Sequence, residues 1–227
     1  MSRSISDVAY AELAQAIATC RLAPGTPLNE RVDGARMGMS RTPFRQALHR
    51  LALEGLVMTL PQRGTFVTPL DPGDIENNMR VREAIEIEMA RYVIEHGRDL
   101  DFDALEHHIG RQKRSVESGD WLGFLGDDEA FHQDILAASG NARALEAARR
   151  CWLHVNRARY VMPMSRAAMR LALSQHRDIV RALKSADPAR TEAAIRRHLE
   201  APLNRTLVQL ARTIPAAFRV APAEERS

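Results

Sequence analysis

The sequence predicts a mainly α-helical protein made of two parts. Apolar residues recur at i, i+3, i+4 and i+7 over most of the chain, which is the spacing of helices that bury one face. Only residues 57–67 have the β-branched residues and central turn of a β-hairpin. A segment rich in proline and glycine follows them. We therefore expect an N-terminal domain at 1–69, a linker at 70–74, an all-α bundle of six to seven helices at 75–213, and a disordered tail at 214–227.

Three helices are expected before the hairpin. The first covers about residues 6–20, and the second begins near Asn29 and closes at Gly38. The third starts after Ser40, a natural N-cap, and ends at Gly55, which suits a left-handed turn. Its inward stripe is formed by Phe44, Ala47, Leu48 and Leu51.

The spacing of the third helix leaves a polar face that includes Arg41, Arg45, Gln46 and His49. Arginine reads guanine edges and grips phosphate, and a helix N-terminus also favours phosphate. A charged face is by itself more often only a solvated surface. However, residues 1–70 contain eight arginines against five acidic residues, so they carry the whole net charge of +3. This concentration of positive charge indicates a surface that binds nucleic acid.

A helix followed directly by a hairpin with Arg63 at its tip is the layout of a winged helix-turn-helix domain. Residues 8–67 resemble the DNA-binding domain of GntR-family bacterial transcription regulators. The motifs that carry the resemblance are LAPGTPLNE at 22–30, SRTPFRQAL at 40–48, EGL at 54–56 and RGTFV at 63–67. The resemblance implies a DNA-binding set of Arg31, Ser40, Arg41, Thr42, Arg45, Arg63 and Gly64, with Arg63 on the wing that reaches the minor groove.

The second helix departs from the family pattern, because Asp33 and Gly34 replace the usual leucine-alanine pair. Glycine weakens a helix by roughly 1 kcal/mol relative to alanine, and an aspartate cannot fill an apolar site. Val32 is the candidate to fill it instead. Gln46 also replaces the usual glutamate.

Beyond the linker the pattern is helical throughout, with helices expected at about 74–97, 101–118, 120–139, 142–162, 166–185 and 188–212. Three of these helices carry polar residues on apolar stripes: Asp128 and His132 on the third, His176 on the fifth and His198 on the sixth. Asp128 and His132 are four residues apart and therefore share one face. One such histidine alone is more often a hydrogen-bonded core residue. Four residues on three stripes favour a metal site with nitrogen and oxygen ligands.

The second part resembles the FCD domain of the FadR subfamily of these regulators. Its metal-binding members have an aspartate and a histidine four residues apart and two later histidines, which match Asp128, His132, His176 and His198. The adjacent carboxylate, Asp127, falls about 100° off the inward face, and we interpret His154 as a structural residue or an outer partner of the metal ligands.

The resemblance further implies a divalent transition metal and a small carboxylate effector. Zinc is the first candidate, with nickel and manganese as alternatives. Arg82 is the predicted carboxylate clamp, although a simple ion pair with Glu86 explains it equally well. Asn156 and Arg159 are further candidates for effector binding.

These observations predict a ligand-responsive transcription regulator, acting as a repressor, that binds operator DNA as a homodimer. Two alternatives remain, a metal-dependent hydrolase and a regulator whose metal is purely structural. Two cysteines and the lack of a long uncharged apolar run predict a cytoplasmic protein with no membrane association.

Overall fold

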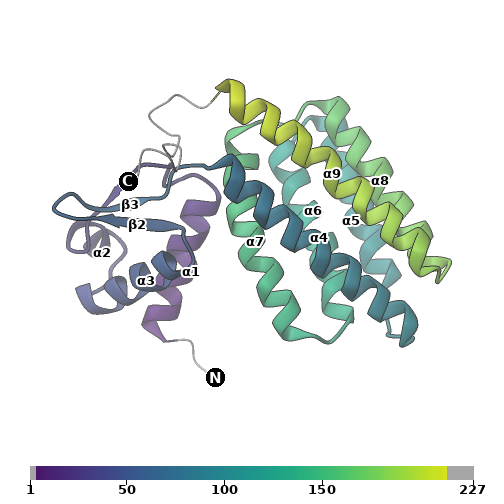
Figure 1. The fold of residues 1–227 in the computed structure, drawn as a ribbon, viewed down its shortest axis with the longest axis horizontal. Helices are drawn as coiled ribbons and strands as arrows, with labels where there is room; N and C mark the ends of the chain where they lie inside the picture. The colour runs from purple at the N-terminus through teal and green to yellow at the C-terminus, as the bar shows by residue number, and fades with distance from the viewer. Residues whose placement is uncertain (1–3, 214–227) are drawn as a thin grey trace. The chain divides into compact units, whose positions relative to one another are not determined.

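The computed structural model describes residues 4–213, and it confirms a mainly α-helical fold (Figure 1). The elements described are α1 (Ile5–Ala18), β1 (Pro27–Leu28), α2 (Val32–Arg36), α3 (Arg41–Leu53), β2 (Val57–Leu60), β3 (Gly64–Val67), α4 (Pro72–Glu95), α5 (Phe102–Ser118), α6 (Trp121–Ala138), α7 (Ala142–Val161), α8 (Arg166–Lys184) and α9 (Pro188–Thr213). The tail expected at 214–227 lies outside the described residues.

The chain divides into two compact units. Among the described residues, the first unit contains the chain up to Ile75, the segment Leu153–Val161 and the end of α9. The second contains Glu76–Trp152 and Met162–Gln209. Because α7 runs from Ala142 to Val161, its two halves belong to different units.

The first unit is a three-helix core with a small antiparallel sheet. β2 pairs with β3 from Val57 opposite Val67 to Leu60 opposite Gly64, as the hairpin pattern predicts. A third strand, β1, joins the other edge of β3 and gives the order β1-β3-β2. The buried residues of this core are Ala9, Leu13, Ala14, Ile17, Leu28, Phe44, Ala47, Leu48, Leu51, Leu56, Val57 and Val67.

Local sequence accounts for the ends of these helices. The Ser4 hydroxyl and the Asp7 carboxylate form a reciprocal capping box at the start of α1. α3 begins after Ser40, which has the extended backbone of an N-cap, although its side chain makes no capping hydrogen bond. Gly55 has a φ of 73°, so the prediction that it makes the left-handed turn after this helix is confirmed.

The structure explains the unusual Asp33-Gly34 pair in the second helix. Asp33 does not occupy an apolar site, because its carboxylate accepts a hydrogen bond from the backbone N–H of Asn29 at 2.7 Å. The Asn29 side chain in turn accepts from the N–H groups of Arg31 and Val32. The expectation that Val32 fills the core was wrong, because Val32 is 46% exposed.

Gly34 is the buried residue of α2. An added Cβ at Gly34 would lie 3.5 Å from Phe44, an ordinary van der Waals contact, so Phe44 lies against this part of α2. The core at this point is therefore closed by the ring of Phe44 rather than by a side chain of α2.

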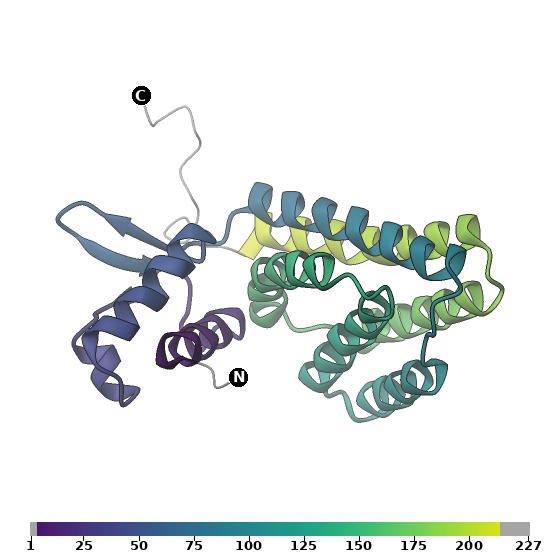
Figure 2. The ribbon, with the colours of Figure 1, turned by 90° about the horizontal axis from the view of Figure 1, so that it is seen from below.

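The second unit is helical, and its helices agree with the predicted ranges to within about two residues at most ends. Side chains cap four of them at the N-terminus: Asp101 for α5, Asp120 for α6, Asn141 for α7 and Ser165 for α8. α4 and α9 run side by side along one side of the bundle (Figures 1 and 2). An ion pair between Glu83 and Arg196 joins these two helices.

No helix within residues 4–213 is long and apolar enough to cross a membrane. The long helices instead carry a buried stripe and a charged outer face, as α8 does with its stripe from Ala168 to Leu183.

Candidate metal centre and DNA-binding surface

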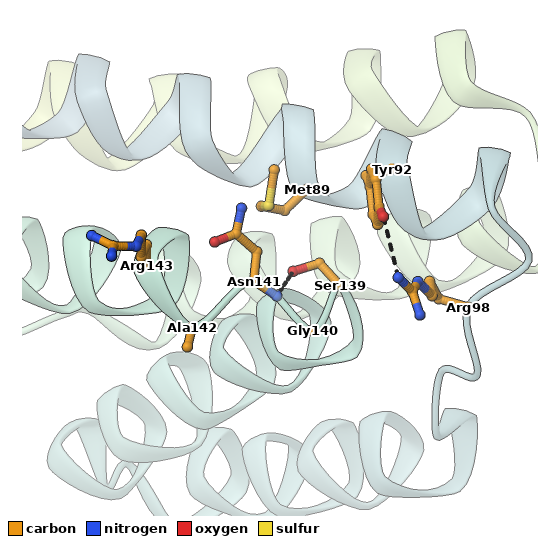
Figure 3. Close-up of a pocket in the computed structure, with 8 residues that line it drawn as sticks. All are labelled: Met89, Tyr92, Arg98, Ser139, Gly140, Asn141, Ala142 and Arg143. Atoms are coloured by element: carbon orange, nitrogen blue, oxygen red, sulfur yellow. Dashed lines mark hydrogen bonds between the residues drawn. The ribbon is translucent and has the colours of Figure 1, made fainter.

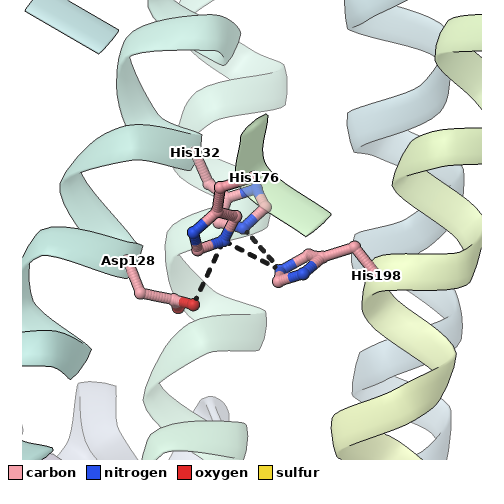
Figure 4. A group of neighbouring side chains, drawn as sticks. All are labelled: Asp128, His132, His176 and His198. Carbon is pink, nitrogen blue, oxygen red and sulfur yellow. Dashed lines mark hydrogen bonds and ion pairs between the residues drawn. The ribbon is translucent and has the colours of Figure 1, made fainter. Parts of the chain in front are cut away.

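Three helices of the second unit bring the four predicted metal ligands together. Asp128 and His132 project from α6, His176 from α8 and His198 from α9, and their side chains converge on one point (Figure 4). All four are buried, and their donor atoms lie within 4.8 Å of one another. The helical spacing that places Asp128 one turn before His132 therefore produces a cluster that could hold a metal ion.

Each histidine of this cluster is held through its Nδ1 atom. His132 Nδ1 lies 2.8 Å from a carboxylate oxygen of Glu86, and His176 Nδ1 lies 2.7 Å from Oε1 of Gln112. His198 Nδ1 is 3.4 Å from Oε1 of Gln175, whose amide nitrogen donates to the Arg197 carbonyl. Since these oxygens are acceptors, each Nδ1 is the donor, and each Nε2 is left with its lone pair.

The three Nε2 atoms face one another. His198 Nε2 lies 3.1 Å from His132 Nε2 and 3.2 Å from His176 Nε2, and Asp128 Oδ1 lies 3.5 Å from His176 Nε2. Lone pairs and a carboxylate oxygen repel one another at such distances unless a cation lies among them. The donor set therefore fits a transition-metal ion, for which neutral imidazole and carboxylate are ordinary ligands.

The protonation of the cluster agrees with metal ligation. Burial, followed by the neighbouring His176 and His132, lowers the pKa of His198 well below its usual value, so this imidazole is neutral. Burial opposes ionisation of Glu86, but the charge of Arg82 and the hydrogen bonds from His132 and Arg82 outweigh it and lower the pKa of Glu86 to about 2. Glu86 is therefore an ionised hydrogen-bond acceptor.

Arg82 lies beside the cluster on α4. Its Nε donates to Glu86 at 2.5 Å, so the predicted ion pair is present. Its Nη2 has no hydrogen-bond partner, although Arg82 is only 2% exposed. The guanidinium also lies over the ring of Trp152 of α7, with its carbon 5.6 Å from the ring centroid. The ion pair thus leaves one buried donor of Arg82 for another acceptor.

The structure also places the two neighbouring residues, Asp127 and His154, which the sequence analysis left outside the ligand set. Asp127 lies off the face of the cluster, as expected, but it is buried and pairs with Arg111 of α5 at 2.7 Å. Of the two roles expected for His154, the structural one agrees with its contacts, and the role of an outer partner of the metal ligands does not. Within the first unit, His154 bonds Asp74 through Nδ1 at 2.7 Å and the Glu54 carbonyl through Nε2 at 2.8 Å.

The remaining effector candidates lie on the half of α7 that belongs to the first unit. Asn156 is buried and Arg159 is half-buried. The histidine cluster belongs to the second unit. A role of Asn156 and Arg159 in effector binding is therefore not tested and stays a prediction.

Sequence reasoning missed the glutamines that hold His176 and His198. A signal was present for Gln112, because it follows Leu105 and Ile109 on the buried stripe of α5 and is itself fully buried. The same reasoning that selected polar residues on apolar stripes would have found it, had it been applied to amides as well as to histidines and carboxylates.

A separate surface pocket of about 440 Å³ lies between the end of α4 and the turn from α6 to α7 (Figure 3). Arg98 in its wall donates to the hydroxyl of Tyr92 at 3.1 Å. Its lining residues are Met89, Tyr92, Arg98, Ser139, Gly140, Asn141, Ala142 and Arg143. None of these residues belongs to the histidine cluster, and most of them are exposed.

The predicted DNA-binding residues lie on the surface of the first unit. Arg41, Thr42 and Arg45 are exposed at the start of α3, while Phe44 faces the core. Within residues 4–213, neither Arg41 nor Arg45 forms a salt bridge. Arg50 differs, because Asp7 and Glu54 pair with it. The arginines nearest the helix N-terminus are thus available to phosphates or base edges.

The remaining members of this set are also accessible. Arg31 and Ser40 are exposed beside α2 and α3. Arg63 and Gly64 are exposed at the tip of the hairpin, where Gln62 and Gly64 have φ values of 60° and 100°. These left-handed conformations make the tight turn that presents Arg63 at the end of the wing.

Family comparison agrees with this architecture. Residues 5–67 match the model of bacterial regulatory proteins of the gntR family, and residues 78–201 match the FCD domain. The chain belongs to the GntR family. It is a DNA-binding transcription regulator with an FCD effector domain.

The alignments of this GntR-family chain with its relatives cover most of both sequences. The chain is 34% identical over 192 residues to an HTH-type transcriptional regulator in an unstable DNA locus of Streptomyces ambofaciens, covering 85% of this chain and 80% of the relative. It is 30% identical over 199 residues to the HTH-type transcriptional repressor RspR of Escherichia coli K12, covering 88% and 87%. The solved structure of E. coli McbR/YncC has the same fold, with a TM-score of 0.80 at 18% identity, over 92% of this chain and 99% of that one.

Proposed function

We propose that this GntR-family regulator is a cytoplasmic repressor that binds an operator as a homodimer and releases it when a small organic acid binds beside a metal ion in the FCD domain. The observation that carries the proposal is the convergence of three imidazole Nε2 atoms and one carboxylate in the buried core of the second unit. A regulator does not need such a cluster for packing, because apolar residues would fill the same space at lower cost.

The metal would be held by Asp128, His132, His176 and His198, and it would supply a positive charge and a Lewis-acidic centre for an anionic ligand. Zinc is the first candidate, and nickel and manganese are the alternatives, because nitrogen and oxygen ligands distinguish poorly among these ions. Arg82 would bind the effector carboxylate through its unpartnered Nη2. A role of Asn156 and Arg159 in effector binding remains a prediction from the sequence.

DNA recognition is assigned to two elements of the first unit. Arg41, Thr42 and Arg45 on α3 would enter the major groove, supported by Ser40 and Arg31. Arg63 and Gly64 on the wing would contact the minor groove. One recognition helix reads only a half-site. Two copies of the chain would therefore bind the two half-sites of a pseudo-palindromic operator as a homodimer. Repression is inferred from relatives such as RspR, which is named a repressor.

A second candidate is a regulator whose metal is structural. Asp128, His132, His176 and His198 offer four donor atoms, which would be enough to hold a structural zinc ion without any further ligand. An effector would bind the metal directly only if the ion accepted a ligand beyond these four side chains. The hydrolase alternative has less support, because the relatives are named as transcription regulators.

Operator binding can be tested with a DNA site obtained by in vitro selection on the full-length protein. We expect Arg41→Ala and Arg45→Ala each to weaken binding by about 1–3 kcal/mol in fluorescence anisotropy at fixed salt. Arg190→Ala, on the exposed surface of α9, is the matched control and should have no effect. Equal binding by all three variants would place DNA recognition elsewhere.

The proposed response to an effector can be tested by measuring thermal stability and operator binding. Both are measured on the chelated protein and again after reloading with zinc, nickel or manganese. Sugar acids, hydroxy acids and dicarboxylates are the probes. A ligand at a hundred times its dissociation constant should add about 2.7 kcal/mol of stability, only when metal is present, and should weaken operator binding. If the metal stabilises the protein but no acid changes DNA affinity, the structural-metal alternative is correct.

A further inference from the structure

The second half of α7, Leu153–Val161, contacts the end of α3 within the first unit. His154 Nε2 lies 2.8 Å from the carbonyl oxygen of Glu54, the C-cap residue of α3. Because a carbonyl oxygen only accepts, this ring nitrogen is the donor. The ring also lies against the turn that follows, since an added Cβ at Gly55 would lie 3.5 Å from its Cε1 atom. His154 therefore holds the point at which α3 ends.

The same half of α7 also holds the end of the wing strand β3. Arg157 follows His154 by three residues, so the two side chains share one face of the helix. Its Nη2 donates to the carbonyl of Thr68, the residue directly after β3. The N–H of Thr68 donates to the Leu56 carbonyl at 3.0 Å, just after α3. The backbone of Thr68 is thus held between α7 and the segment that joins α3 to β2.

Arg157 is a costly residue for this position. It is only 2% exposed, and its Nε has no hydrogen-bond partner within residues 4–213. Burial lowers the pKa of its guanidinium, because desolvation disfavours the charged form. An apolar side chain would fill the same space at lower cost. The directed hydrogen bond to Thr68 therefore indicates a requirement for position rather than for packing.

We propose that His154 and Arg157 are positioning residues for DNA recognition, which fix the angle between α3 and the wing. Arg45 on α3 and Arg63 on the wing can contact one duplex together only if this angle matches the spacing of its grooves. Both positioning residues lie outside the gntR match at 5–67 and inside the FCD match at 78–201. A segment of the FCD match thus completes the DNA-binding unit. This inference rests on the proposed function, because it presupposes the DNA contacts of Arg45 and Arg63.

A double-mutant cycle on the full-length protein tests the contact with the wing. Operator affinity is measured by fluorescence anisotropy, at fixed salt and well below the melting temperature, for Arg63→Ala, Arg157→Met and the double variant. Methionine keeps an unbranched apolar chain but removes the donor. We expect Arg157→Met to weaken binding about fivefold or more, because the wing loses its position. Arg63→Ala should then weaken binding by a factor at least about threefold smaller in the Arg157→Met protein than in the unmodified one.

Two further variants separate position from stability. Arg143→Met, in the exposed first turn of α7, is the matched control and should leave the effect of Arg63→Ala unchanged. Arg157→Lys retains a donor and should restore most of the coupling to Arg63. An equal effect of Arg63→Ala in the unmodified and Arg157→Met proteins would overturn the inference and leave the DNA contacts of the proposed function intact. If Arg63→Ala alone has no effect, the proposed wing contact fails, and the inference fails with it.

The contact with α3 is tested in the same way by His154→Leu and Arg45→Ala. This second cycle does not depend on the folding of the Arg157 variants. Loss of the hydrogen bond to Glu54 should reduce the effect of Arg45→Ala about threefold. If the two changes act independently in a protein whose melting curve shows that it is folded, His154 does not position α3.

Discussion

Two glycines of the first unit have opposite roles at the scale of single residues. Gly55 has a φ of 73°, a conformation that costs other L-residues about 1–2 kcal/mol. Gly34 lies within α2, and an added Cβ would meet the Met39 carbonyl at 3.4 Å and Phe44 at 3.5 Å. These are ordinary van der Waals distances. Only the first glycine is therefore required by its backbone.

We expect Gly34→Ala to stabilise the protein by up to about 1 kcal/mol, because alanine loses less conformational entropy in a helix. Gly55→Ala should destabilise it by about 1 kcal/mol or more. Thermal denaturation of both variants measures the contrast. A destabilised Gly34→Ala protein would show that Phe44 cannot accommodate even a methyl group, and that the close approach of α2 is needed for packing.

At the scale of elements, the register of α6 decides which carboxylate can ligate a metal. Asp127 and Asp128 are adjacent and both buried, but they point to different neighbours. Asp128 joins His132 and His176, whereas Asp127 pairs with Arg111. A rotation of about 100° between successive helical residues separates the two functions.

Exchanging either carboxylate for an amide should separate metal binding from stability. Asp128→Asn should lose most of the metal-dependent stabilisation, which is about 2.7 kcal/mol at a hundred times the dissociation constant. Asp127→Asn should lower stability by about 1 kcal/mol through the loss of its ion pair and should keep its response to metal. Urea denaturation with and without metal measures both. An equal loss of the metal response in the two variants would contradict the proposed ligand set.

At the scale of the whole molecule, regulation requires that effector and operator affect each other's affinity. The helix α7 contributes to both units, since its residues up to Trp152 belong to the unit of the histidine cluster and Leu153–Val161 belong to the first unit. In the proposed regulation, the coupling energy is set by the difference in effector affinity between the two states of the protein.

Thermodynamic linkage makes this coupling testable from either side. If the effector weakens operator binding by a given factor, the operator must weaken effector binding by the same factor, with about 5–150-fold as the typical range. Anisotropy with saturating effector and calorimetry with saturating operator measure the two factors. Unequal factors would show that a further equilibrium, such as dimer dissociation, contributes to release.

Local patterns in the sequence determined most of the fold. Helical periodicity and N-capping residues set where α5 to α8 begin, because these signals act within one or two turns. The hairpin and the exposed arginines of α3 followed from equally local patterns. The same periodicity identified Asp128, His132, His176 and His198, since a costly buried polar group stands out on an apolar stripe.

Tertiary structure decided the features that depend on neighbours distant in the chain. The strand β1 has only two residues, and it exists because β3 offers a free edge. Val32 is exposed because Asn29 and Asp33 cap the short α2 and Phe44 packs against Gly34. Gln112 and Gln175 are matched to their histidines only by the packing of α5, α8 and α9. Sequence periodicity tells which face of a helix is buried, but the partner that each buried polar atom meets is set by packing between helices.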